Sequence, residues 1–284
     1  GETKIPLQVL AISGVLNVGL NLFFVLVLKM TVNGVATATV IANMVSSLLL
    51  FIKLIRTKQV IQIKKEEITF DRELFLKIME IGLPAGIQTA VFAIANIVIQ
   101  SAINSLGTIV MAASSAALNI EICVYDILNS FSQACTTFVG QNYGAGNLKR
   151  CRKILGLCII EDAIATALMI LFVILFGKTL LSLFNNDPRV INIGYTRLLI
   201  IFTAYTFSML YENMSGYLRG FGISLLPAIL TTIGVCGVRI IWISFVFPLR
   251  RTFSTIILAY PLSLSITAVL IFLALMKYRP SRIR

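Results

Sequence analysis

The amino-acid sequence predicts an all-α integral membrane protein, a polytopic bundle of about eight transmembrane helices. Of its 284 residues, 58% are hydrophobic and only 13% are charged, whereas about a quarter of the residues of a soluble domain are charged. Uncharged stretches of about 20 residues, long enough to cross a bilayer, recur along the chain. With no histidine in the sequence, histidine metal ligands and a histidine proton shuttle are excluded.

Uncharged windows define these helices in order along the chain. Residues 5–28, 30–52 and 252–276 contain no charged residue, and each window can form one span. The uncharged residues 81–120 are long enough for one helix, a tight connection and the first turns of another. The other spans carry one or two charges each. The predicted spans are residues 6–28, 35–55, 82–106, 109–139, 154–176, 195–218, 225–246 and 256–276.

Basic residues predict how these spans are oriented in a cell (inner) membrane. Eight spans place both ends of the chain on one side, where 17 Lys and Arg residues fall, against six, including Arg197, on the other side. By the positive-inside rule both termini are cytoplasmic. Basic loops therefore explain the net charge of +12. We expect contact with membrane lipids and no binding of nucleic acid.

An internal repeat predicts the domain organisation. The spacing Gly1-x4-Pro6 returns as Gly222-x4-Pro227, as expected for a parallel duplication of six helices. Residues 1–55 would then be the last two helices of an N-terminal lobe, residues 56–80 a cytoplasmic linker, and residues 81–284 a six-helix C-terminal lobe. About four helices would precede Gly1, whether the fragment is natural or comes from an incomplete gene.

Three short motifs carry a resemblance to a known family. Ile-Gly-Leu-Pro-Ala-Gly-Ile-Gln at 81–88, Val-Gly-Gln-Asn-Tyr-Gly-Ala-Gly-Asn at 139–147 and Leu-Arg-Gly-Phe-Gly at 218–222 resemble the MATE (multidrug and toxic compound extrusion) transporters. The resemblance runs through the whole chain and implies twelve helices in two lobes. It implies export of organic, often cationic, drugs driven by inward flow of Na⁺ or H⁺. We expect no enzymatic activity and no cofactor apart from that coupling ion.

Acids inside predicted spans are candidates for function, because a charge at membrane depth costs several kcal/mol. The five acids are Glu121, Asp126, Glu161, Asp162 and Glu212. Glu161 and Asp162 lie near the start of their predicted span, where a helix favours acids in any case. Asp126 is the strongest candidate, since helical periodicity places it on one polar face with Asn119, Asn129, Gln133 and Thr136.

Two further polar stripes accompany that face. One comprises Gln88, Asn96, Gln100 and Asn104, and the other Tyr205, Ser208, Glu212, Ser215 and Arg219. The stripes either surround a water-filled cavity or hydrogen-bond one another between helices. If the stripes surround a cavity, the residues predicted to bind the substrate or cation are Asp126, Glu121, Asn119, Tyr125, Asn129, Gln133, Gln88, Asn96, Gln100, Tyr205 and Glu212. No metal site is predicted.

The sequence departs from one branch of the family. Members with a sodium site in the C-terminal lobe carry carboxylates at the positions occupied here by Phe92 and Ser208. The resemblance therefore does not imply that sodium site. Asp126 and Glu121 become the better candidates for the carboxylates that bind the coupling ion.

Two other functions remain open. A lipid-linked oligosaccharide flippase of the same superfamily needs a cationic cavity for its pyrophosphate, whereas the interior is expected to hold five acids and only Arg239. An integral-membrane enzyme would have to rely on a pair of acids, since the sequence offers neither histidine nor closely spaced cysteines. A cationic substrate exchanged for Na⁺ or H⁺ remains the leading prediction.

The predicted orientation can be tested with single cysteines at Lys58 in the linker and at Arg282 in the tail. Both should resist a membrane-impermeant thiol reagent in intact cells, because both segments are cytoplasmic under the positive-inside rule. Labelling of either position from outside would refute this topology.

Overall fold

The computed structural model describes residues 4–57, 62–64 and 69–278, so Lys58 and Arg282 lie outside the described residues. The described residues form helices and no strand, which confirms the predicted fold class. Seven helices among them are long and apolar enough to cross a membrane, and a bent pair can form an eighth span. The protein is therefore a multi-pass membrane protein. The chain divides into two compact units, Gly1–Phe75 and Leu76–Arg284.

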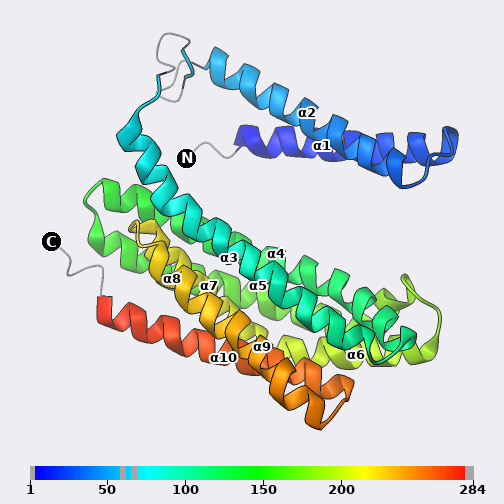
Figure 1. The fold of residues 1–284 in the computed structure, drawn as a ribbon. Helices are drawn as coiled ribbons and strands as arrows, with labels where there is room; N and C mark the ends of the chain where they lie inside the picture. Colours follow the sequence, from blue (N-terminus) through cyan, green and yellow to red (C-terminus); the bar gives the residue numbers. More distant parts are fainter. Residues whose placement is uncertain (1–3, 58–61, 65–68, 279–284) are drawn as a thin grey trace. The chain divides into compact units, whose positions relative to one another are not determined.

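The first unit contains a hairpin of two helices, which lie side by side in Figure 1. α1 (Lys4–Leu22) continues through a π-helical stretch, η1 (Phe23–Val27), and α2 (Val32–Arg56) returns along it. The buried residues of α2 are small and recur every fourth position: Gly34, Ala38, Ala42 and Ser46. Small residues at this spacing let two membrane helices pack closely without a large apolar core.

The second unit is a bundle of six spans (Figure 1). Three are the long helices α3 (Arg72–Asn104), α4 (Thr108–Gly144) and α5 (Leu148–Ser182). The fourth is α6 (Pro188–Thr203) with α7 (Tyr205–Gly220), bent by 47°. The fifth runs through α8 (Leu225–Thr231), η3 (Thr232–Gly237), α9 (Val238–Ile241), η4 (Trp242–Val246) and η5 (Phe247–Leu249). The sixth is α10 (Phe253–Tyr278).

Several helices extend beyond the predicted spans. α3 begins at Arg72, inside the expected linker, and α5 begins at Leu148, six residues before the predicted start at residue 154. Hydropathy marks only the part that is apolar enough for lipid, while helical hydrogen bonding continues through the charged ends. As a consequence, Asp162 lies in the middle of α5. The prediction that it sits near a helix start is wrong.

α4 is the central helix of the second unit and packs against α5, α6 and α7. Its contact with α7 depends on hydrogen bonds from hydroxyl side chains to backbone carbonyls of the partner helix. Ser132 Oγ donates to Glu212 O over 2.7 Å, and Thr136 Oγ1 donates to Gly216 O over 3.0 Å. A Cβ added at Gly216 would lie 2.5 Å from the backbone oxygen of Ser132. Only glycine at this position therefore permits the observed approach of the two helices.

We predict that Gly216→Ala separates α4 from α7 and destabilises the protein by about 1–3 kcal/mol, the usual cost of overpacking. Thermal unfolding in detergent measures the effect. Gly156→Ala is the matched control, because a Cβ at this glycine meets nothing within 4 Å. Equal unfolding temperatures for the two variants would contradict the close approach.

Candidate functional site

Two adjacent cavities lie inside the second unit. The larger, which we call the Glu212 cavity, has a volume of about 410 Å³, within the range of about 300–1,000 Å³ typical of ligand pockets. The smaller, the Arg239 cavity, has a volume of about 220 Å³. Phe92 and Tyr125 line both cavities. The polar stripes predicted from the sequence therefore contribute to two neighbouring cavities.

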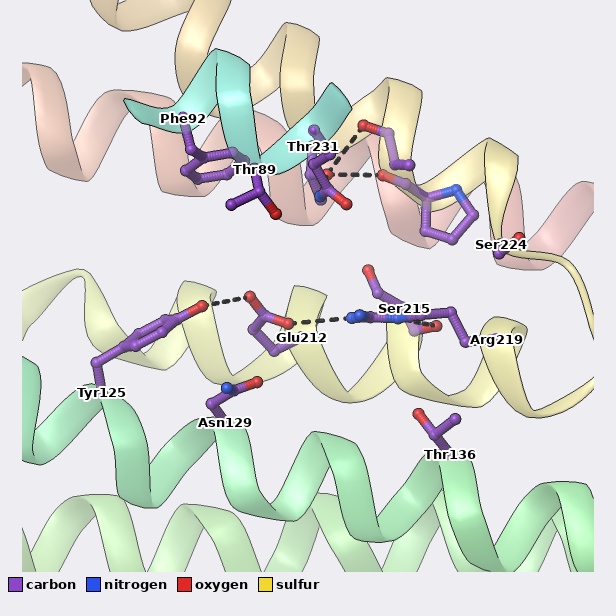
Figure 2. A pocket seen from close by; sticks show the side chains of 13 residues that line it. Thr89, Phe92, Tyr125, Asn129, Thr136, Glu212, Ser215, Arg219, Ser224 and Thr231 are labelled. Carbon is purple, nitrogen blue, oxygen red and sulfur yellow. Dashed lines mark hydrogen bonds and ion pairs between the residues drawn. The ribbon is translucent and has the colours of Figure 1, made fainter. Parts of the chain in front are cut away.

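The Glu212 cavity is formed by α3, α4, α7 and α8, and Figure 2 shows Glu212 between Tyr125 and Arg219. The Tyr125 hydroxyl donates to Glu212 Oε1 over 2.9 Å, and Arg219 Nη2 lies 3.3 Å from Glu212 Oε2. The glutamate is 9% exposed, whereas the Arg219 side chain is 41% exposed. Solvent around Arg219 weakens this ion pair. Across the cavity, Gln88 Nε2 donates to Thr231 Oγ1 and links α3 to α8.

Glu121 forms a buried ion pair with Arg197. Arg197 Nε lies 2.6 Å from Glu121 Oε1, and Nη2 lies 2.9 Å from Oε2, so the pair is bidentate. Arg197 Nη1 also donates to Ser114 Oγ over 2.6 Å, and the side chains of Arg197 and Glu121 are only 2% and 5% exposed. The charge of Glu121 is thus compensated within the bundle.

The placement of Arg197 corrects the sequence-based charge count. The charge count places Arg197 among the bases of the non-cytoplasmic side, but the residue lies on the buried face of α6 with Val190, Gly194, Leu198 and Ile201. The interior therefore contains Arg197 as well as Arg239, and the expectation that Arg239 was the only interior base is wrong. Helical spacing along α6 indicates this placement, because Val190, Gly194, Arg197 and Ile201 recur every three or four positions and Leu198 is adjacent to Arg197.

Asp162 forms a second buried polar cluster, between α5 and α7. It is 0% exposed, and Thr166 Oγ1 donates to its Oδ1 over 2.9 Å. Asn213 Nδ2 donates to its Oδ2 over 2.5 Å. Neither cavity includes Asp162. This carboxylate holds two helices together and has no opening to a ligand.

The two remaining acids, Asp126 and Glu161, are exposed, and neither has a hydrogen-bond or ion-pair partner among the described residues. They differ in their surroundings. Asn119 and Gln133 are exposed on the same face of α4 as Asp126. Glu161 instead lies on a face of α5 with exposed apolar side chains: Leu157, Ile160, Ile164 and Leu168. The α4 face also exposes Leu118 and Ile122, but its carboxylate and amides suit contact with water, whereas the apolar α5 face around Glu161 suits lipid.

The predicted site residues thus fall into three groups, with Gln100 apart from them and Tyr125 shared by two. Gln88, Tyr125, Asn129 and Glu212 line the Glu212 cavity. Asn96, Glu121, Tyr125 and Tyr205 line the Arg239 cavity. Asp126, Asn119 and Gln133 are exposed on α4, and Gln100 donates to Asn104 Oδ1 over 2.8 Å. Phe92 and Ser208, at the positions of the alternative sodium site, both line the Arg239 cavity.

Three contributors to the Arg239 cavity are not apparent as site residues from the sequence. Arg239 stands out there only as a charge inside a span, and Tyr211 and Tyr260 belong to none of the polar stripes. The Tyr260 ring lies 4.1 Å from Arg239 Cζ and 5.4 Å from Arg197 Cζ, so it contacts both guanidinium groups. Tyrosine is common in apolar helices, and its spacing alone gives no sign of this role.

Comparisons with known proteins agree with the fold. The MatE family model matches residues 84–244. The chain is 25% identical to the probable multidrug resistance protein YoeA of Bacillus subtilis, covering 84% of this chain and 53% of that protein. It is also 25% identical to the probable multidrug resistance protein NorM of Thermotoga maritima, covering 84% of this chain and 52% of that protein. The chain therefore spans about half the length of these relatives.

A solved structure described as MATE in the straight conformation shares the fold. Its TM-score is 0.85 at 19% sequence identity, with coverage of 98% of this chain and 63% of that chain. At this identity the likeness supports the arrangement of helices alone.

The buried ion pair gives a prediction about stability. Glu121→Gln should destabilise the protein by about 3–5 kcal/mol, because it leaves the Arg197 charge buried without a partner. Combining it with Arg197→Met should restore much of the loss. Thermal unfolding of the two single variants and the double variant measures this coupling.

The control is the exposed pair of Arg189 with Asp187, whose side chains are 72% and 31% exposed. Hydrogen bonds from Arg189 lower the pKa of Asp187, but solvent surrounds both groups. Asp187→Asn should therefore barely change unfolding. Additive effects of Glu121→Gln and Arg197→Met would argue against a buried pair.

Proposed function

The chain belongs to the MatE family, as its three motifs predicted, and we propose that it functions in a secondary active antiporter. The antiporter would export organic cations, including drugs and other toxic compounds, in exchange for Na⁺ or H⁺. The observation that carries this proposal is Asp126, an acid without a partner among the described residues, on the polar exposed face of a membrane-spanning helix.

The other acids support this choice by elimination. Arg197 neutralises Glu121, Arg219 and Tyr125 engage Glu212, and Thr166 and Asn213 engage Asp162. Glu161 is exposed among apolar side chains, where a cationic drug would have no polar contact besides the acid itself. Asp126 alone combines a free carboxylate with neighbouring amides that can hydrogen-bond a substrate.

Coupling follows from competition for one negative charge. A cationic substrate needs the ionised carboxylate, whereas a proton or a sodium ion neutralises it, so the ligands exclude each other. The release of substrate on one side and of the ion on the other then requires two lobes that alternate in access, in keeping with the parallel repeat. In this scheme Glu121 positions α4 through Arg197 and does not contact the substrate.

The lipid-linked oligosaccharide flippase remains a second candidate. Arg239 favours it, because this interior cation has no carboxylate partner among the described residues and would suit an anionic head group. The exposed polar face around Asp126 favours the cation antiporter. Among the described residues, no group of three or more Cys, Asp and Glu is arranged to hold a metal ion.

We predict that Asp126→Asn, introduced into the complete gene, abolishes efflux of a cationic dye while expression and membrane insertion stay intact. The amide keeps the shape and removes only the charge. Glu161→Gln is the matched control and should retain wild-type efflux, because its acid lies on the apolar face of α5. Dye accumulation in cells across a pH series provides the readout.

Wild-type efflux by Asp126→Asn at every pH would refute the assignment of the coupling carboxylate. Loss of efflux in both variants would show that any negative charge in these spans is needed for efflux. That result would refute a specific role for Asp126.

A further inference from the structure

Arg239 is an interior cation whose charge is not balanced by the residues around it. It is 8% exposed and lies within the span Leu225–Leu249. Its Nε donates to Ser263 Oγ over 3.0 Å, and its guanidinium packs on the Tyr260 ring. A guanidinium has five N–H donors. Within the described part of the chain, only Nε has a hydrogen-bond partner and no carboxylate pairs with the group.

The acids that line the two cavities are already compensated. Glu121 shares the cavity with Arg239, but Arg197 holds both of its carboxylate oxygens. Glu212 lies in the neighbouring cavity and pairs with Arg219. The Arg239 cavity therefore carries one excess positive charge. A buried charge without a counterion is unfavourable by several kcal/mol, and an anion inside the cavity would relieve this cost.

The cavity wall indicates what kind of anion fits. Asn96 and Ser208 supply polar groups to the lining, while Phe92, Tyr205 and Tyr211 supply aromatic surface. A volume of about 220 Å³ is below the range of about 300–1,000 Å³ for drug-sized ligands. One excess charge suits one carboxylate, and aromatic walls suit a ring attached to it.

The backbone around Arg239 is specialised as well. α9 is a four-residue α-helical segment between the π-helical stretches η3 and η4. Such π-helical insertions are frequent at functional sites, because they redirect side chains. A Cβ added at Gly234 in η3 would lie 3.1 Å from Thr267 Cα, so this span packs tightly against α10. Arg239 lies in the same span, five residues after Gly234, and its guanidinium packs on Tyr260 of α10.

From these observations we infer that the Arg239 cavity is a binding site for a small aromatic monocarboxylate. Arg239 holds the carboxylate with its free N–H groups, and the aromatic side chains enclose the ring. This site is distinct from Asp126 and goes beyond the proposed cation exchange, which does not require it. Binding can be measured without transport, so the failure of either proposal leaves the other standing.

Isothermal titration calorimetry of the purified chain in detergent tests the site with three probes: sodium benzoate, its neutral analogue benzamide, and sodium chloride. We expect saturable binding of benzoate and no saturable binding of benzamide. Chloride should compete only weakly, because it leaves the aromatic wall empty. These three titrations are made with the wild-type chain and need no variant.

Arg239→Gln should weaken benzoate binding at least tenfold, and Arg239→Lys should retain part of it. Removing an unpaired buried charge should leave folding intact. Arg251→Gln is the matched control, since Arg251 is exposed and its loss changes the net charge equally.

Equal binding of benzoate by Arg239→Gln and by the wild type would overturn the site. Equal binding of benzamide and benzoate would show that carboxylate recognition is absent. Chloride binding as tight as benzoate binding would identify a halide site and overturn the carboxylate assignment.

Discussion

The low dielectric of the membrane interior is the constraint on which this protein's arrangement depends. A charge in this environment must be paired, hydrogen-bonded or in contact with water. The bidentate pair of Glu121 with Arg197 meets this requirement and ties α4 to α6. Tyr205 adds a bond from its hydroxyl to the Glu121 carbonyl oxygen and so brings the start of α7 to the same point. The centre of the six-span bundle is built around this pair.

The same constraint separates structural acids from functional ones. Asp162 is satisfied by Thr166 and Asn213 in a closed cluster, so it joins helices and has no access to ligand. Glu212 borders a cavity of drug size but is engaged by Tyr125 and Arg219. Substrate chemistry is then left to groups that the bundle does not neutralise. Two of them have polar or aromatic surroundings that suit a ligand: the exposed carboxylate of Asp126 on α4 and the interior guanidinium of Arg239 on α9. The unpaired Glu161 lies among apolar side chains instead.

Sequence patterns predicted the helices well, because the need for apolar spans is local to each stretch of chain. Charge pairing is not local: Arg197 and Glu121 are 76 positions apart, and Asn213 and Asp162 are 51 apart. A charge near the predicted end of a span looks like a loop residue until its helical face is known, so Arg197 was misplaced. Helical spacing predicts which polar residues share a face, but only the folded structure divides them between two cavities and an exposed face.

The roles assigned to Asp126 and Glu161 require the exposed face of α4 to meet water and the exposed face of α5 to meet lipid. Cysteine accessibility measures this difference, with Asp126→Cys and Glu161→Cys compared in membranes after the five native cysteines are replaced. A charged, water-soluble thiol reagent should modify the cysteine at position 126 rapidly and leave position 161 unreacted, because only a hydrated thiol ionises and reacts. Equal reaction at both positions, or faster reaction at position 161, would contradict the assignment of the α4 face to water and the α5 face to lipid.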